Sequence, residues 1–585
     1  MKTPRFLPWI SASEDRRFKF GPIDLFVFIA IGFMIWIIGS LGHDMTAPLS
    51  PDAHSEISLD LWHLPYYAAR STLRMFIAYF FSLIFTMIIG WWAAHSKRAR
   101  TFLLPALDIL QSVPVLGFLS VTVTGFMSLF PGSLLGVECA SLFAIFTGQV
   151  WNMIFGFYHS LVTIPENLSE AASSFHLNPW QRFKWLELPS GAISLIWNSM
   201  MSFGGGWFFV VQSEAITVLH QDIKLPGIGS YMSVAMEKGD NKAALAALVA
   251  MIIIIVVTDQ LLWKPVIAWS QKFKNEQVEG SEVFTSWFLE VIRRAGFIRT
   301  ILVDGWQGLI SILDKFFSFV LQKSDREFQK HPVTKKYLMQ LYGLGIWFLI
   351  GSLIWLGIKL GFQVKTSMSS DEILHIAWLG ILTMMRVFVM VLVATLIWTP
   401  IGVWIGFRPK MAKIIQPFAQ IAASFPVNLT FPFVVGFFVA HSISMDWGSI
   451  LLLALGTQWY ILFNVIAGAM SVPSDLKETA AVFHLSGLRI WKTLIIPAIF
   501  PYWVTGACTA AGGAWNASIV AEFASWGQNK LVAKGLGAFI AQATEKGDWP
   551  AIFCSILIMS LFVVVLNRLL WRNLYDYAEK RFRLD

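Results

Sequence analysis

Residues 170–189 read "EAASSFHLNPWQRFKWLELP", and residues 478–497 read "ETAAVFHLSGLRIWKTLIIP". Glu170 and Glu478 are 308 positions apart, and the prolines that close the two stretches have the same separation. Each stretch is polar, although apolar segments flank it on both sides. Because matching residues of the two stretches are all the same distance apart, the chain carries a large internal repeat.

The repeat extends over most of the chain. At the separation of 308, the matching features are a glycine pair, a Trp, a Glu and the run "EKGD": 204–205 with 512–513, Trp207 with Trp515, Glu214 with Glu522, and 237–240 with 545–548. Upstream the separation is 312, which aligns Arg74 with Arg386 and Pro114 with Pro426. The chain is therefore a tandem duplication of one membrane domain, and we call its copies half one and half two.

The composition is that of a polytopic membrane protein. Hydrophobic residues make up 56% and charged residues 14% of the 585 residues, and the mean hydropathy is +0.62. Soluble domains carry about 25% charged residues. Anchoring charges on the cytoplasmic side explain the net charge of +8. The sequence has no basic segment interleaved with aromatic residues, so it does not indicate nucleic-acid binding.

We predict an all-α polytopic membrane protein with two tandem six-helix domains, about 12 transmembrane helices of about 20 residues each. The expected spans of half one lie near 23–41, 73–94, 105–130, 135–160, 190–218 and 244–263. The expected spans of half two lie near 341–361, 378–406, 417–440, 447–470, 498–524 and 550–571.

The distribution of Lys and Arg predicts the orientation. Basic residues follow the second span of each half, at 97–100 and 408–413, whereas the first outer loop at 43–69 has four acidic residues and no Lys or Arg. The positive-inside rule then places both termini in the cytoplasm. The predicted divisions are an N-terminal cytoplasmic segment at 1–22, a first membrane domain at 23–263, a linker at 264–340, a second membrane domain at 341–571 and a cytoplasmic tail at 572–585.

The linker at 264–340 mixes apolar and charged residues. Because the charges interrupt its apolar positions, we do not expect a further span. We expect amphipathic helices that lie on the inner leaflet, with bracing of a cytoplasmic partner as the alternative.

A short cytoplasmic helix is predicted between the fourth and fifth spans of each half. In half one, Pro-Glu at 165–166 suits a helix start, and Asn-Pro at 178–179 ends this helix and caps the next. Ser486 takes the capping place in half two. Ala171 and Ala172 provide small residues that allow close approach to a groove on another protein.

"EAA", followed at nineteen residues by the Pro of "LP", resembles the cytoplasmic coupling motif of binding-protein-dependent ABC transporter permeases. Other stretches resemble the second span, the third span and the loop after the fifth span of the nitrate/sulfonate/taurine/bicarbonate branch. They are "STLRMFIAYFFSLIFTMIIG" (71–90) with "RVFVMVLVATLIWTPIG" (386–402), "PALDILQSVP" (105–114) with "PFAQIAASFP" (417–426), and "GIG" (227–229) with "GLG" (535–537).

In that family the short helix enters a cleft of an ATP-binding subunit, so the resemblance implies that both membrane domains are permease domains. The implied coupling residues are Glu170, Ala171, Ala172 and His176 in half one and Glu478, Thr479, Ala480 and His484 in half two. The two histidines stand where the family usually has Gly, and Thr479 stands where it has the first Ala. Either the histidines stabilise the helix end through its dipole, or they contact a partner.

Uncharged polar and aromatic residues in the spans are the candidates for a substrate path. They are Gln149, Trp151, Asn152, Trp207, Asn428, Gln458, Trp459 and Trp515. We expect Arg74 and Arg386 to reach water at the outer end of the second span, with attraction of an anion as the alternative. We expect Glu214 and Glu522 to bond to neighbouring helices.

The resemblance implies the transmembrane subunit of an ATP-driven importer for a small anion, in a bacterial or archaeal cell (inner) membrane. The chain has no phosphate-binding G-x-x-x-x-G-K-[ST] loop, so we expect no enzyme activity, catalytic residue, metal or cofactor in this chain. ATP and Mg would be bound by two copies of an ABC ATP-binding subunit, and the solute by a separate solute-binding protein. Membrane lipid is the remaining expected contact, and no nucleic acid is expected.

The alternative is a secondary active transporter with two six-helix halves. Such a protein would need titratable or ion-binding groups near the middle of the membrane, and the predicted spans contain few. It would also leave the duplicated cytoplasmic motif without a role.

Overall fold

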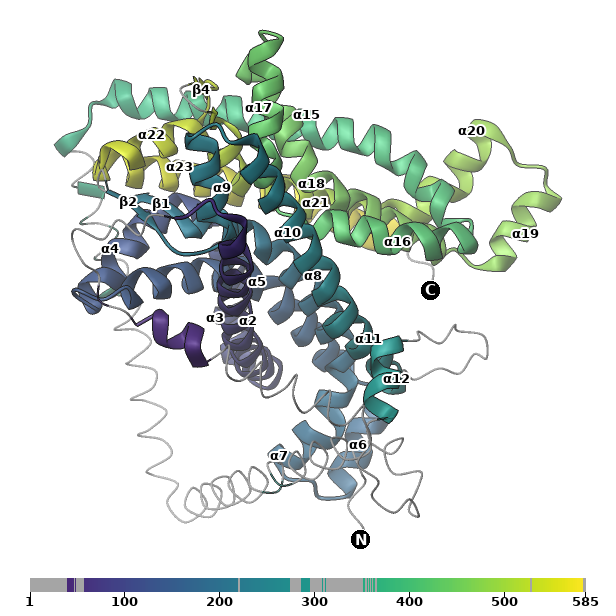
Figure 1. The fold of residues 1–585 in the computed structure, drawn as a ribbon. Helices are drawn as coiled ribbons and strands as arrows, with labels where there is room; N and C mark the ends of the chain where they lie inside the picture. The colour runs from purple at the N-terminus through teal and green to yellow at the C-terminus, as the bar shows by residue number, and fades with distance from the viewer. Residues whose placement is uncertain are drawn as a thin grey trace.

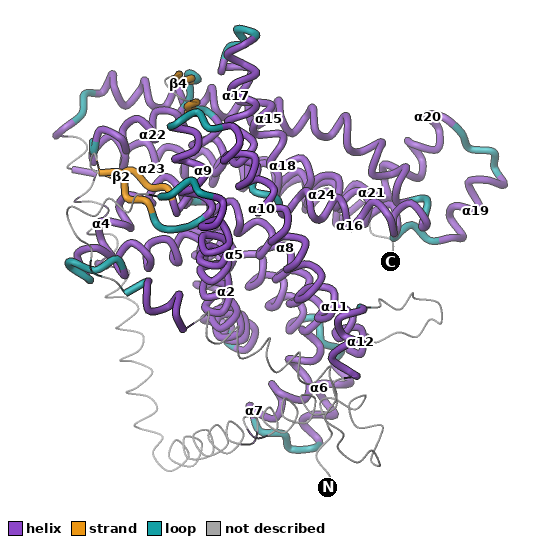
Figure 2. The backbone as a smooth tube through the Cα atoms, in the orientation of Figure 1, coloured by secondary structure: helices purple, strands orange, loops and turns teal. Residues whose placement is uncertain are grey.

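The computed structural model describes residues 39–46, 48, 57–218, 221–273, 286–294, 366–526 and 529–581, with single positions between 308 and 362. Helices make up nearly all of this part of the chain, and two short β-hairpins are the exception (Figures 1 and 2). The N-terminal segment at 1–22, most of the linker and almost all of the expected spans near 23–41 and 341–361 lie outside the described residues.

Half one contains the following elements in chain order: η2 (Leu61–His63), α2 (Leu64–His95), α3 (Lys97–Ser112), η3 (Val115–Phe118), α4 (Leu119–Leu129), α5 (Leu135–Val162), α6 (Glu166–Ser174), α7 (Pro179–Arg182), η4 (Phe183–Glu187), α8 (Leu188–Glu214), β1 (Ala215–Val218), β2 (Gln221–Lys224), α9 (Ile228–Glu237), α10 (Asn241–Thr258), η5 (Asp259–Trp263), α11 (Lys264–Ser270) and η6 (Gln271–Phe273). In the linker, α12 spans Trp287–Arg294.

Half two repeats this order: α15 (Ser370–Gly406), α16 (Pro409–Ser424), η7 (Val427–Thr430), α17 (Phe431–Ala440), α18 (Met445–Met470), α19 (Ser474–Val482), α20 (Gly487–Ile490), η8 (Trp491–Ile495), α21 (Ile496–Ala521), β3 (Phe523–Trp526), β4 (Asn529–Val532), α22 (Leu536–Lys546), α23 (Trp549–Leu566), η9 (Asn567–Trp571) and α24 (Arg572–Arg581). The duplication in the sequence is thus a duplication of structure.

Seven helices among the described residues are long and apolar enough to cross a membrane. They are Leu61–His95, Leu135–Val162, Asn241–Ser270, Ser370–Gly406, Met445–Met470, Gly487–Ala521 and Trp549–Ala578. The all-α polytopic fold is confirmed. The total of about 12 spans, each of about 20 residues, and the orientation with both termini inside stay predictions.

The third span of each half is broken into two helices at a proline. In half two, Lys410–Ser424 and Val427–Ala440 meet at 79°. The break lies at Pro426, and at Pro114 in half one, where the preceding residue has an extended backbone with ψ of 126° and 123°, respectively. A proline ring clashes with a helical residue before it, which explains why both helices end there.

Each half is built on three long helices that pack side by side, α2, α5 and α8 in half one and α15, α18 and α21 in half two. The broken spans reach across to the other half. Val115, Leu116 and Leu119 belong to a buried cluster made mostly of half-two residues, and Leu429 belongs to the main cluster of half one. Each half therefore contributes apolar side chains to the core of the other half.

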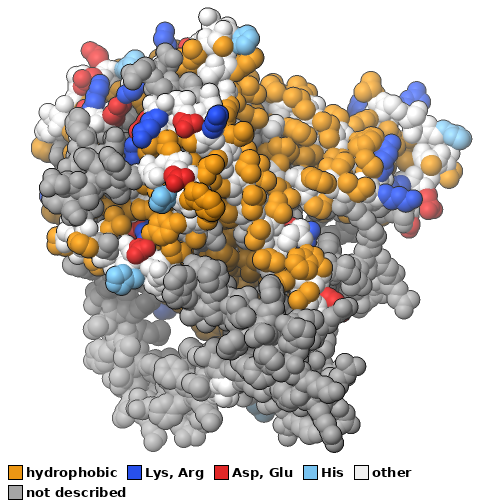
Figure 3. All heavy atoms as spheres, viewed as in Figure 1, with side chains coloured by type: hydrophobic (Ala, Val, Ile, Leu, Met, Phe, Trp, Pro, Cys, Tyr) orange, Lys and Arg blue, Asp and Glu red, His pale blue; other side chains and the backbone are white. Residues whose placement is uncertain are grey.

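The two halves are joined near their hairpins and diverge from there (Figure 1). Around the join, α22 contacts β1 and α9 contacts β3. At the other end, α6 with α7 and α19 with α20 lie at the tips of two separate arms. Figure 3 shows hydrophobic side chains over the broad face between these ends, with charged groups gathered near the hairpins and near α19 and α20. Such a face suits contact with lipid.

Candidate functional site

The short helices α6 and α19, which we call the motif helices, lie where the sequence predicts them. The turn after α6 is fixed by a reciprocal capping box. Asn178 Oδ1 accepts from Gln181 N at 2.8 Å, and Gln181 Oε1 accepts from Asn178 N at 3.0 Å. Asn178 is thus confirmed as the cap of α7. Ser486 is the N-cap residue of α20, but its side chain makes no capping hydrogen bond.

Each motif helix is followed by a histidine in the left-handed backbone conformation. The φ angles are 49° for His176 and 50° for His484. Around the first of them, Leu177 N donates to Ala172 O at 3.2 Å and His176 N donates to Ser173 O at 3.0 Å. This bonding pattern is the Schellman motif, whose left-handed position favours Gly because Gly has no Cβ. The family's usual Gly therefore has a backbone role, and the histidines occupy a strained position.

We expect His176→Gly, and separately His484→Gly, to stabilise the end of its motif helix by about 0.5–1 kcal/mol, because the left-handed strain of an L side chain is removed. Hydrogen exchange of the backbone amides at 175–178 and 483–486 measures the effect, and slower exchange is the expected result. Faster exchange would show instead that the imidazole stabilises the helix end, as the dipole interpretation requires.

The exposed surface of the motif helices combines acidic, small and aromatic side chains. Glu170 and Ala171 are exposed, whereas Ala172 is buried. The small-residue face expected from the two alanines is therefore divided between two sides of the helix. Phe175 is 76% exposed, and its counterpart Phe483 is 71% exposed. In half two, Glu478 and Thr479 are exposed and Ala480 is buried.

A chain of polar contacts connects α6 to the long helices of half one. Arg182 Nη2 donates to Ser169 Oγ of α6 at 2.8 Å, and Arg182 Nε donates to Glu187 Oε1 at 2.9 Å. The buried Glu187 also bonds to Trp91 Nε1 at 3.0 Å and to His95 Nε2 at 2.8 Å, both near the end of α2. A displacement of α6 is thus connected to α2 through the buried carboxylate of Glu187, whose partners Arg182 and His95 are each 34% exposed.

Half two makes this connection differently. Ile490 and Ile495 stand at the positions of Arg182 and Glu187, so the ion pair is absent. Instead, Lys477 Nζ lies 5.0 Å from the ring centroid of Phe407, which follows α15. Such a cation–π contact links the same two elements with less geometric restraint.

Three of the predicted path residues lie inside the halves. Gln149 is fully buried, its Oε1 accepts from Ser82 Oγ at 3.3 Å, and its Nε2 lies 3.3 Å from Met75 Sδ. Trp207 and Trp515 are 1% and 3% exposed and belong to the two cores. Gln149 bonds within half one, whereas Trp207 and Trp515 pack in cores to which both halves contribute.

The other path candidates lie nearer the surfaces of the halves. Gln458 Oε1 accepts from Trp398 Nε1 at 2.8 Å, and Trp459 Nε1 donates to Leu455 O at 3.0 Å. Trp151 is half-buried and Asn152 is exposed. The structure does not bring these residues of half one and half two together.

Asn428 is the one path candidate that bridges the halves through a hydrogen bond within the described residues. Its Nδ2 donates to Phe208 O of half one at 3.5 Å. Its side chain is buried, and its Oδ1 has no partner among the described residues. An unsatisfied buried amide oxygen is costly, so this atom is suited to accept a hydrogen bond from water or a solute.

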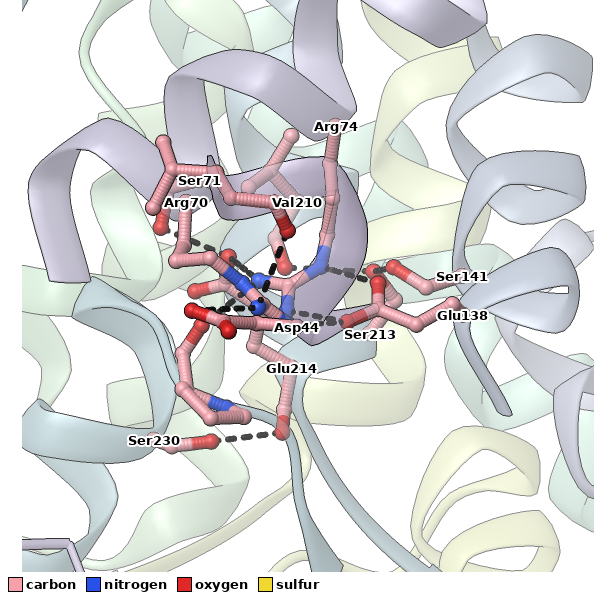
Figure 4. A network of polar contacts seen from close by, with 12 residues as sticks. Asp44, Arg70, Ser71, Arg74, Glu138, Ser141, Val210, Ser213, Glu214 and Ser230 are labelled. Carbon is pink, nitrogen blue, oxygen red and sulfur yellow. Dashed lines mark hydrogen bonds and ion pairs between the residues drawn. The ribbon is translucent and has the colours of Figure 1, made fainter. Parts of the chain in front are cut away.

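A buried ion-pair cluster in half one joins α2, α5, α8 and the start of α9 (Figure 4). Arg74 Nη2 donates to Glu138 Oε1 at 2.7 Å, and Arg74 Nη1 donates to Glu214 Oε1 at 2.7 Å. Arg70 Nη2 also donates to Glu138 Oε1, at 2.7 Å. All four side chains are at most 1% exposed. The expectation that Arg74 reaches water is wrong, because two carboxylates from other helices neutralise it inside the protein.

Half two has a smaller version of this cluster. Arg386 Nη1 donates to Glu522 Oε1 at 2.9 Å and Arg386 Nη2 donates to Asp446 Oδ1 at 2.7 Å. Arg386 is 9% exposed, so it too is paired within the protein rather than extended to water, while Asp446 is 41% exposed. The expectation that Glu214 and Glu522 bond to neighbouring helices is confirmed.

The clusters explain why a Glu and a G-x-G sequence occur together in each half. Gly229 N donates to Glu214 Oε2 at 2.8 Å, and Gly537 N donates to Glu522 Oε2 at 2.8 Å. A Cβ on Gly229 would lie 2.2 Å from Val211 O of the main chain. The glycine lets the loop approach α8 closely enough for its N–H to reach the carboxylate. Sequence reasoning missed this link, although the fixed order of Glu and G-x-G in both halves was a signal for it.

The "EKGD" runs turn the chain into the sixth span, as their composition suggests. Gly239 and Gly547 have φ of 66° and 68°. Asp240 accepts from Lys242 N at 2.9 Å, and Asp548 accepts from Ala551 N at 3.2 Å. Among the described residues, no group of three or more His, Cys, Asp or Glu side chains is placed to hold a metal ion.

Comparison with known proteins identifies relatives of both halves. Residues 86–262 and 398–584 each match the family described as "Binding-protein-dependent transport system inner membrane component", and together they make up more than half of the chain. The chain is 27% identical over 192 residues to the nitrate import permease protein NrtB of Leptolyngbya laminosa, which is 33% of this chain and 65% of that protein.

Two further relatives have related functions. The bicarbonate transport system permease protein CmpB of Synechococcus elongatus is 25% identical over 204 residues, which is 34% of this chain and 70% of that protein. The aliphatic sulfonates transport permease protein SsuC of Bacillus subtilis is 27% identical over 185 residues, which is 30% of this chain and 63% of that protein. The chain thus spans 63–70% of the length of these three relatives.

Proposed function

The chain belongs to the family of binding-protein-dependent transport system inner membrane components, and from this premise we propose that it is the transmembrane subunit of an ATP-driven importer for small anions. It is a duplicated ABC permease, so one chain supplies both permease domains of the transporter. The observation that carries the proposal is the pair of motif helices at the tips of the two diverging arms (Figure 1).

In the proposed mechanism, one ABC ATP-binding subunit docks on each motif helix. Each helix offers an exposed Glu, and an exposed Phe follows it at the helix end, Glu170 with Phe175 and Glu478 with Phe483. Aromatic residues are enriched in protein–protein interfaces. When ATP draws the two subunits together, the arms move with them, because the buried Glu187 ties α6 to α2 through Arg182. The chain itself holds no cofactor in this mechanism, since ATP and Mg are bound by the partners.

The proposed substrates are small anions of the nitrate, sulfonate, taurine or bicarbonate class. The relatives named for nitrate, bicarbonate and sulfonates support this class. A separate solute-binding protein delivers the anion to the hairpin end, and the anion crosses between the halves. The proposed location is a bacterial or archaeal cell (inner) membrane.

The proposal is tested in proteoliposomes that contain the full chain and a cognate ABC ATP-binding subunit. Uptake of nitrate, bicarbonate and an aliphatic sulfonate is measured with the cognate binding protein present. We expect uptake of one of these anions that requires ATP and the ATP-binding subunit. Uptake driven by a proton or sodium gradient without that subunit would favour the secondary transporter instead.

A further inference from the structure

Two polar contacts between the halves each pair an aspartate of half one with an amide side chain of half two. On one side, Gln420 Nε2 of α16 in half two donates to Asp259 Oδ1 of half one at 3.2 Å. On the other side, Asn567 Nδ2 of half two donates to Asp108 Oδ1 of α3 in half one at 3.2 Å. Asp108 and Gln420 are equivalent positions in the repeat, and so are Asp259 and Asn567.

At both pairs of equivalent positions, half one has the carboxylate and half two has the amide. Half one supplies the carboxylate of both pairs, once from its third span and once from its sixth. Half two supplies the amide of both pairs, again once from each span. Each contact therefore joins one acceptor-only group with one donor, and neither contact places two carboxylates together.

Two further cross-half contacts also take their amide side chains from half two. Asn428 of half two donates to the main-chain oxygen of Phe208 in half one at 3.5 Å. On the other side, Val115 N of half one, whose counterpart Val427 precedes Asn428, donates to Asn516 Oδ1 of half two at 2.8 Å. Asn516 is the counterpart of Phe208, so half two again supplies the amide side chain in both contacts.

The positions of the carboxylates and amides determine which halves are able to pack on each other. If half one packed on a second half one, Asp108 would face Asp259 at both contacts. Two carboxylates about 3 Å apart repel, and at least one must be neutralised. Lys264 Nζ lies 3.9 Å from Asp259 Oδ2 but is 38% exposed, so it offsets only part of that repulsion. If half two packed on a second half two, Gln420 would face Asn567, and two amides can bond to each other.

Burial makes the mismatch expensive. Asp259 is 8% exposed and lines a pocket at the junction of the halves, together with Gly204, Trp207, Gln420 and Ser424. A charge in such a site is tolerated only when hydrogen bonds or an opposite charge compensate it.

We propose that these reversed carboxylate–amide pairs specify the assembly of the permease, so that half one fits half two and is excluded from packing on another half one. The interface thus uses repulsion against a wrong partner as well as attraction to the right one. The halves are consequently not interchangeable, although they share one fold. The inference concerns the contact between halves and is independent of which solute is transported.

Asn567→Asp tests the exclusion in the full chain, because it places a carboxylate opposite Asp108 as a second half one would. Arg572 stands at the position of Lys264, so a cation is also present at the equivalent position of the sequence. A specific protease site is inserted in the linker between Phe273 and Ser286, and the purified chain carries an affinity tag at its C-terminus. After cleavage in lipid nanodiscs and transfer to mild detergent, the half one that stays with tagged half two is measured by size exclusion.

We expect half one to stay bound in the unsubstituted chain and to be lost roughly tenfold more in Asn567→Asp. Adding Asp108→Asn restores one carboxylate and one amide at this contact, and we expect half one to stay bound again. Gln420→Glu, alone and with Asp259→Asn, tests the other contact in the same way.

Two controls separate the exclusion from general damage. Asn573→Asp adds the same charge at an exposed position of α24, and half one should stay bound. Asp108→Asn alone creates the amide–amide contact of a half-two pair, and half one should also stay bound. The proposal is overturned if Asn567→Asp retains half one as well as Asn573→Asp does, or if Asp108→Asn fails to rescue it.

Discussion

Arg74→Met lowers the free energy of unfolding of half one by about 3–5 kcal/mol, as expected when one partner of a buried ion pair is removed. Arg74 is fully buried and donates to Glu138, Glu214 and Pro226 O. Without it, Glu214 keeps only its neutral donors, Ser71 and Gly229. The change is measured by unfolding of the purified chain in nanodiscs, followed by Trp fluorescence, together with the yield of folded protein.

Arg386→Met is the matched comparison in half two. Its partner Asp446 is 41% exposed and keeps water, but its partner Glu522 is 0% exposed and would lose its charged partner as Glu214 does, so a loss of similar size is expected. A second comparison adds Glu214→Gln to Arg74→Met, which removes one uncompensated charge and should recover part of the stability. A loss below about 1 kcal/mol for Arg74→Met, which is the range of a surface pair, would contradict a stabilising role for the cluster.

The cluster also shows what the sequence could not provide. Arg74 lies near the start of a predicted span, and a charge in that place usually extends to water. Its actual partners are 64 and 140 positions away in the chain. Which of several acids meets an arginine depends on how the helices pack, and a hydrophobic pattern does not determine that packing. The equivalent acid in half two is Asp446, and this paired occurrence was the one available hint.

Local features were predicted well because local chemistry determines them. Asn178 caps α7 through atoms within three residues of each other. The duplication was also predictable, since it requires only matching residues at a fixed separation. The breaks at Pro114 and Pro426 also have a local cause, because proline restricts the backbone of the residue before it.

The path candidates show the same limit. Gln149 was a candidate because an amide in a span is able to bind a solute, but its side chain is directed to Ser82 and Met75 within half one. Asn428 was chosen by the same reasoning, and it does lie between the halves. A residue type indicates what a side chain is able to bind, whereas the packing of helices decides what it contacts.

Glu170→Arg combined with Glu478→Arg is expected to remove the ATP-binding subunit from the purified chain, with a loss of at least roughly tenfold in co-purification. Both acids are exposed on the motif helices, so the reversal changes the docking surface and leaves the cores intact. Asp371→Arg reverses an equally exposed acid at the start of α15 and should change nothing. Retention of the subunit by the double variant would contradict docking on the motif helices.

The two single variants test whether docking on α6 and docking on α19 contribute equally to transport. Glu170→Arg and Glu478→Arg should each release one of two docked subunits, so the subunit-to-chain ratio should fall by half in either case. ATP-driven uptake should then fall further than the ratio, because alternating access requires both arms to move together. An unequal effect on uptake at equal occupancy would follow from the unequal connections. Arg182 and Glu187 connect α6 to α2 through an ion pair in which Glu187 is buried, whereas Lys477 of α19 makes a cation–π contact with Phe407, which follows α15. We expect Glu170→Arg to be the more damaging of the two.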